Sequence, residues 1–113
     1  MGFLVEKLVV YQKAVDFAET IGKLTEQFPR GQAYIADQLN RAAVSIATNL
    51  AEGNGRYHKA DRANFFRISR GSAFECVPLI ELSLRKGLLS ASQHAELYKQ
   101  LEEISKMLSG LLT

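Results

Sequence analysis

Apolar residues recur at helical spacing along almost the whole chain, and this pattern limits the possible folds more than any other feature. In four segments they lie three and four positions apart, and none shows the apolar–polar alternation of a strand. We expect helices over residues 8–28, 32–52 and 59–86, and a fourth that begins at Ser90. Because the connections are short, the pattern predicts an all-α, up-down-up-down antiparallel four-helix bundle, with residues 1–113 in one domain.

Residues with known effects on helix geometry mark the expected boundaries. Pro29 disfavours helical geometry at the residue before it, and the glycine-rich run at 53–55 favours the left-handed conformation of a helix C-terminus. Ser90 followed by Gln93 is a capping-box pattern. Pro78 lies inside the long third segment and removes a backbone donor, so we expect a kink near it.

Polar residues lie on the stripes that the second and third helices are expected to bury. In the third helix Glu75 follows Phe65 and Ile68 at helical spacing, which places a carboxylate on an apolar face. Unpaired buried polar groups cost about 1–3 kcal/mol each, so we expect a hydrogen-bonded network between the helices. For Arg41 and Glu52, a contact between subunits is the alternative. The candidate members are Arg41, Ser45, Asn49, Glu52, Ser72 and Glu75.

The apolar stripes are also wider than a single bundle requires. Self-association would bury the excess; alternatively, the third helix packs between two neighbours and the extra rows lie in the core of the monomer. The sequence leaves both interpretations open. The extra rows are Ala73, Val77, Ile80 and Leu84 on the third helix, and Tyr11, Val15 and Ala18 on the first.

Positive charge is concentrated at the start of the third helix and in the turn before it. The net charge is only +2, yet residues 56–87 hold seven basic and three acidic groups. Such a cluster predicts contacts with RNA or DNA phosphates, and aromatic rings beside it offer stacking surfaces for an unpaired base. A protein-docking surface or a simple solvated face is the alternative. The candidate residues are Arg56, Tyr57, His58, Lys59, Arg62, Arg67 and Arg70.

Several other classes of function find no support in the sequence. The lone Cys76 cannot form an intramolecular disulfide, and no second thiol or histidine cluster has metal-ligand spacing, so we expect a reduced, cytoplasmic protein without metal or cofactor. No segment approaches 18 uninterrupted apolar residues, which argues against a membrane span. No histidine is spaced to act between Glu75 and Ser72, and we therefore expect no enzymatic activity.

Two motifs, taken together, resemble a known family. The segment SIATNLAEG at 45–53 and the segment GSAFE at 71–75 occur in order, with Phe28-Pro29 before them and Arg56 between them. This combination is similar to the four-helix bundle proteins encoded in intervening sequences of bacterial 23S rRNA genes. The likeness extends from about Leu8 to Leu112 and is carried most specifically by these two segments.

The resemblance implies a cytoplasmic homo-oligomer, with a pentamer as the expected assembly and no established enzymatic activity. The related accessory proteins of diversity-generating retroelements form basic pentameric barrels that associate with a reverse transcriptase and nucleic acid. The resemblance therefore implies a similar role for the basic face of this chain. The alternative is a scaffold or accessory subunit that docks a protein partner.

Overall fold

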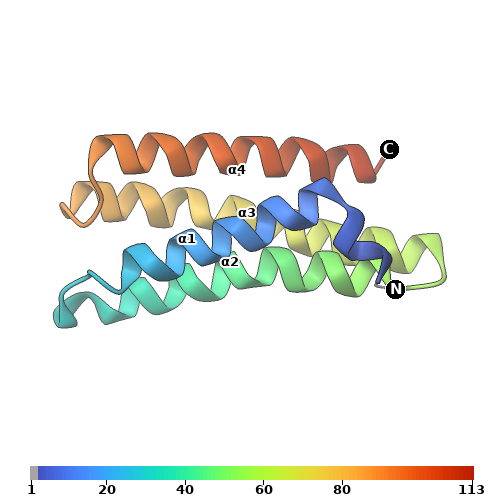
Figure 1. Ribbon diagram of the computed structural model, residues 1–113, viewed down its shortest axis with the longest axis horizontal. Helices are drawn as coiled ribbons and strands as arrows, with labels where there is room; N and C mark the ends of the chain where they lie inside the picture. Colours follow the sequence, from blue (N-terminus) through green and yellow to red (C-terminus); the bar gives the residue numbers. More distant parts are fainter. Residues whose placement is uncertain (1–2) are drawn as a thin grey trace.

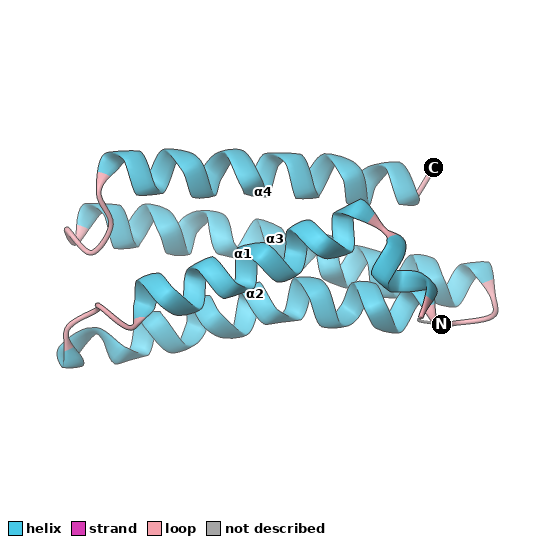
Figure 2. Ribbon diagram, in the orientation of Figure 1, coloured by secondary structure: helices cyan, strands magenta, loops and turns pink. Residues whose placement is uncertain are grey.

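The computed structural model describes residues 3–113, which form helices joined by short loops (Figures 1 and 2). Within this range no residue lies in a strand. The elements in chain order are the 3-10 helix η1 (Leu4–Lys7), α1 (Val9–Thr25), the 3-10 helix η2 (Arg30–Gln32), α2 (Ala33–Asn54), α3 (Lys59–Arg85) and α4 (Ala91–Leu111).

The four long helices lie antiparallel to their neighbours in an up-down-up-down bundle of 43 × 26 × 21 Å (Figure 1). The most extensive contact joins α2 to α3, whereas α1 and α4 contact each other much less. The all-α four-helix architecture predicted from the helical periodicity is confirmed. The two short 3-10 helices were not expected, because single turns leave no periodic signal.

The start of α4 agrees with the capping-box prediction. The Ser90 hydroxyl accepts from the Gln93 backbone N–H at 3.1 Å, and the Gln93 side chain accepts from the Ser90 N–H at 2.9 Å. Before this cap, Gly87 has φ +75°, a left-handed conformation that glycine adopts without strain. α3 runs unbroken through the exposed Pro78, and the predicted kink there stays a prediction.

The end of α2 differs from the sequence expectation. The helix continues through Gly53 to Asn54, and Gly55 has φ −83°, so neither glycine adopts the left-handed conformation that we predicted. Gly53 instead permits a close approach between helices. A Cβ atom at this position would lie 2.9 Å from the Cβ of Phe65 and 2.9 Å from the ring of Phe66. The glycine therefore serves packing between α2 and α3.

A single apolar core runs between the four helices. α3 packs between α2 and α4, and the rows that looked excessive in the sequence fall partly inside the monomer, since Ala73 and Ile80 are fully buried. At these two positions the extra rows therefore belong to the core of the monomer, as the second alternative predicted. The largest fully buried side chains are Phe17, Ile21, Ile35, Leu39, Ile46, Leu50, Ile80, Leu97, Leu101, Ile104, Leu108 and Cys76.

The buried face of α3 is rotated from the one that we expected. Ile68 is 45% exposed and Glu75 is exposed, so the prediction of a carboxylate on a buried stripe is wrong. Serines occupy core positions instead: the Ser69 hydroxyl donates to the Ile46 carbonyl at 2.7 Å, and the Ser83 hydroxyl donates to the Leu79 carbonyl at 2.8 Å. Because these serines satisfy their hydrogen bonds with backbone oxygens, they replace apolar residues at little cost, and counting apolar residues alone misplaces the face.

Candidate nucleic-acid interface

The α2–α3 turn projects beyond the rest of the bundle. The Arg70 guanidinium donates to the Ser109 hydroxyl at 3.1 Å, which places the last turn of α4 level with Arg70. From that level α4 continues only to Leu111, whereas α3 extends back to Lys59, a difference of roughly 13 Å at ~1.5 Å per residue. The turn accordingly lies past the C-terminus in Figure 1. We call this projection, residues 55–66, the tip.

Exposed groups that suit a polyanion lie at the tip and just behind it. Lys59 and Arg67 are exposed, and within the described part of the chain neither forms an ion pair. Tyr57 is 89% exposed, and its ring centroid lies 5.1 Å from that of His58, with the two rings perpendicular. The tip thus combines cations with an aromatic surface that solvent reaches.

Arg56 is held loosely at the start of the tip. Its guanidinium lies 3.3 Å from the Glu52 carboxylate and 4.7 Å from the centre of the Phe65 ring, and about half of each charged side chain is exposed. Surface ion pairs of this kind contribute only about 0–1 kcal/mol. A phosphate can therefore compete with Glu52 for Arg56.

Arg62 has a structural role that the sequence did not reveal. Its guanidinium donates to the Tyr57 carbonyl at 2.8 Å and contacts the Arg56 carbonyl at 3.4 Å, so it ties the first turn of α3 to the loop. One signal was present in the sequence: Arg62 shares the buried register of Phe66 and Ser69. Residues in that register normally face a neighbouring helix. A charged residue there indicates that the neighbouring helix has already ended at that level.

Arg70 lies apart from the other cations. It donates to Ser109 of α4, and its guanidinium lies 6.0 Å from the centre of the Phe74 ring, so it faces the α3–α4 seam. Of the five predicted cations, the structure leaves three with little or no internal engagement, and they are Arg56, Lys59 and Arg67. Asp61 is the only carboxylate in the stretch from residue 56 to residue 70.

Three of the six predicted network residues are joined across α2 and α3. The hydroxyls of Ser45 and Ser72 lie 2.7 Å apart, and the Asn49 amide donates to the carbonyl and hydroxyl oxygens of Ser45, at 2.9 Å each. The other three, Arg41, Glu52 and Glu75, are exposed and make no contact with this network. Their expected place inside it is therefore corrected: they belong to the solvent side of the helices.

That solvent side of α2 and α3, which we call the outer face, also exposes apolar side chains. Tyr34 and Val44 on α2 are 52% and 48% exposed, and Ile68 and Leu82 on α3 are 45% and 40% exposed. Isolated exposed apolar residues are common on soluble proteins. Four on two adjoining helices, spread along the outer face, are the observation that bears on self-association.

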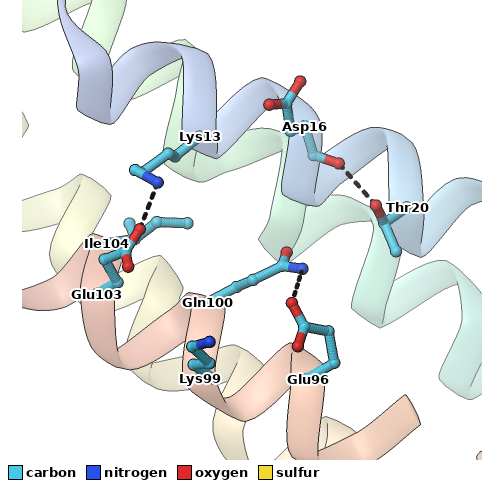
Figure 3. Close-up of a pocket in the computed structure, with 8 residues that line it drawn as sticks. All are labelled: Lys13, Asp16, Thr20, Glu96, Lys99, Gln100, Glu103 and Ile104. Carbon is cyan, nitrogen blue, oxygen red and sulfur yellow. Dashed lines mark hydrogen bonds and ion pairs between the residues drawn. The ribbon is translucent and has the colours of Figure 1, made fainter.

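A polar cleft with a volume of about 310 Å³ lies between α1 and α4 (Figure 3). Lys13 reaches across it to Glu103 at 2.5 Å, and Gln100 donates to Glu96 at 3.2 Å. The hydrogen bond and the positive charge of Lys13 lower the pKa of the Glu103 carboxyl. Its lining holds no thiol or histidine, and Figure 3 shows Lys13 paired with Glu103 and Gln100 with Glu96, as expected of a solvated structural seam.

The remaining reactive groups do not form a site. Cys76 is buried, and burial, aided by the nearby negative charge of Glu75, raises the pKa of its thiol to about 12, so it stays protonated and unreactive. Across residues 3–113 no three His, Cys, Asp or Glu side chains gather where they could hold a metal ion. No helix in the same range is both long and apolar enough to cross a membrane.

The fold and this surface define an all-helical bundle whose α2–α3 hairpin ends in a basic, aromatic tip. The profile of the 23S rRNA-intervening sequence proteins matches residues 6–110, and the chain belongs to this family. It is also similar to a solved protein of unknown function from the S23 ribosomal protein family of Bacteroides thetaiotaomicron VPI-5482. The two are 26% identical, the match covers 93% of this chain and 99% of that chain, and the TM-score is 0.87. No curated protein matches the chain.

Proposed function

We propose that this protein is a non-enzymatic nucleic-acid-binding bundle that grips the phosphate backbone with its tip. The observation that carries the proposal is the projecting turn, where Arg56 and Lys59 stay available, with Arg67 exposed just behind it. Phosphate contacts by lysine and arginine dominate the affinity of proteins for nucleic acids. A projecting hairpin can also reach a groove or a loop without a clash from the body of the bundle.

The proposal is tested by fluorescence anisotropy with structured RNA, single-stranded RNA and duplex DNA. The test variant is Arg56→Gln/Lys59→Gln/Arg67→Gln, which spares Arg62 because that residue holds the turn together. A variant with the same loss of charge at the other end of the bundle, Lys23→Gln/Arg30→Gln/Lys86→Gln, is the matched control. We expect the tip variant to lose at least ten-fold in affinity and the control to lose far less.

We also propose that the protein self-associates through the outer face. The exposed apolar residues on α2 and α3 support this assembly, and Arg41 and Glu75 supply opposite charges on the same face. A repeated tip would strengthen a weak contact with phosphates through multivalency. The pentamer implied by the family resemblance stays a prediction.

Light scattering after gel filtration tests this assembly. We expect the wild type to have a mass that is a multiple of 12.6 kDa, and Val44→Glu to reduce it to a single chain. Val15→Glu, at a valine on α1 that is 41% exposed against 48% for Val44, should leave the mass unchanged if the outer face alone forms the contact. A wild-type mass of 12.6 kDa at micromolar concentration would contradict self-association.

A protein partner is the second candidate, because the same exposed cations would attract an acidic surface. A reverse transcriptase or another polymerase is the partner class that the resemblance to retroelement accessory proteins favours. A pull-down distinguishes the two candidates. A partner that survives nuclease treatment and is lost with the tip variant would support protein docking, and failure of the protein to bind any nucleic acid would point the same way.

A further inference from the structure

A groove beside the tip has the features of a second binding site, separate from the cations proposed to bind phosphates. It lies where η1 and the start of α1 meet the end of α2, and its volume is about 740 Å³. Ligand sites in proteins commonly fall between about 300 and 1,000 Å³ and are lined by apolar and aromatic groups with a few polar ones. Most of this lining is apolar. It includes Phe3, Leu4, Tyr11, Ala51, Asn54 and Gly55.

The polar groups of the groove are suited to a neutral ring with a hydrogen-bonding edge. The Asn54 and Tyr11 side chains are half-buried, and their polar atoms are not among the described buried atoms that lack a hydrogen-bond partner, so they are free to bond a ligand in place of water. An amide both donates and accepts, which matches the edge of a nucleobase. The rings of Phe3 and Tyr11 provide stacking surface in the same groove.

Charge separates the groove from the tip. Glu6 lines the groove, and its carboxylate accepts from the Phe3 backbone N–H at 2.9 Å, so a phosphate would be repelled there. Gly55, which also lines the groove, is followed directly by Arg56, the first cation of the tip. The N-terminal segment and the α2–α3 turn accordingly lie at the same end of the bundle (Figure 1).

We propose that this groove binds an unpaired nucleobase of a single strand whose phosphates lie on Arg56 and Lys59. The inference rests on the proposed function and sharpens it, because it names single-stranded nucleic acid as the preferred ligand. Bases in a duplex are stacked and paired, so they cannot enter the groove. The duplex keeps only the phosphate contacts and binds more weakly.

The test compares one RNA sequence as a single strand and as a duplex, by anisotropy, with wild type and Phe3→Ala. Phe3 is 80% exposed, so its truncation should leave the fold intact, which thermal melting checks. We expect the single strand to bind more tightly than the duplex, and Phe3→Ala to weaken the single strand by about five-fold or more with the duplex unchanged. Tyr98→Ala, at an exposed aromatic residue of α4, is the matched control and should change neither.

A second readout reports on the base itself. A single strand that contains 2-aminopurine should change its fluorescence when it binds wild type, and Asn54→Ala should diminish this change. Equal affinity for single strand and duplex, or an unaltered single-strand affinity in Phe3→Ala, would overturn the groove assignment. If binding then still depends on Arg56 and Lys59, only the groove assignment fails. If wild type binds neither form at low salt, the proposed function fails with it.

Discussion

The α2–α3 seam and the α1–α4 seam close the same bundle by different means. Between α2 and α3, Gly53 lets the helices approach closely, and Ser45 and Ser72 share a hydrogen bond within that seam. Between α1 and α4 lies a polar cleft that Lys13 and Glu103 bridge near solvent (Figure 3). The α2–α3 hairpin is therefore the more closely packed of the two helix pairs, and it carries the tip.

The largest effect on stability should come from overfilling the tight seam. In Gly53→Val the new side chain meets Phe65 and Phe66, and overpacking of this kind costs about 3 kcal/mol. We expect the melting temperature, followed by circular dichroism, to fall by on the order of 10 °C. Gly71→Val is the control, because no atom lies within 4 Å of the added Cβ. Equal losses in the two variants would disprove a special role for Gly53.

Burial of Cys76 within the tightly packed part of the core should appear as a pH dependence. Its pKa is about 12 in the folded protein and 9.0 as the reference value, so above pH 9 the unfolded chain releases a proton that the folded chain retains. The free energy of unfolding should therefore fall as pH rises, by up to ~1.4 kcal/mol per pH unit from this thiol. Urea titrations between pH 8 and 10.5 measure this slope, and Cys76→Ala should flatten it. Equal slopes for the wild type and Cys76→Ala would mean that the thiol is exposed to water and would contradict its burial.

A smaller effect should follow from removal of the inter-helix hydrogen bond. Ser72→Ala leaves Ser45 with its bond to Asn49, so we expect a loss of about 1 kcal/mol. A double-mutant cycle with Ser45→Ala isolates the interaction, because the two losses should not add. Strict additivity would mean that the two hydroxyls do not interact in solution.

The α1–α4 seam should be the least sensitive. Glu103→Gln removes an exposed ion pair, and we expect a smaller shift in melting temperature than Ser72→Ala produces. The folded-state pKa of Glu103 is lowered, so its contribution is present above the unfolded pKa and is lost as pH falls through the folded one. The wild type and Glu103→Gln should therefore converge in acid. A shift larger than that of Ser72→Ala would reverse the ranking of the two seams.

Periodicity and capping rules were enough to predict the architecture, because long amphipathic helices and a Ser90 cap leave strong local signals. They failed where tertiary packing decides the conformation. Gly53 looked like a helix stop and instead serves close packing. The prediction put the wrong face of α3 in the core, because Ser69 and Ser83 are buried there with their hydroxyls donating to backbone oxygens.

The sequence predicted which residues form the basic cluster, but it predicted the role of only some of them. The sequence did not indicate which cations are engaged in contacts within the protein and which stay available. Arg62 binds backbone carbonyls and Arg70 binds Ser109. The Arg70 contact depends on where α4 ends relative to α3, which no local pattern encodes. The Arg62 contact depends on the path of the turn before α3. The groove beside the tip was missed altogether, since η1 has too few residues to produce a periodic signal.

Whether the tip holds the nucleic acid is tested by the salt dependence of RNA binding for the wild type, the tip variant and the far-end variant, which is the control Lys23→Gln/Arg30→Gln/Lys86→Gln. If the tip neutralises phosphates, the plot of log affinity against log salt should become shallower by about one unit for each lost contact in the tip variant. The far-end variant should keep the slope of the wild type. Equal slopes for the two variants would show that the tip does not hold the nucleic acid.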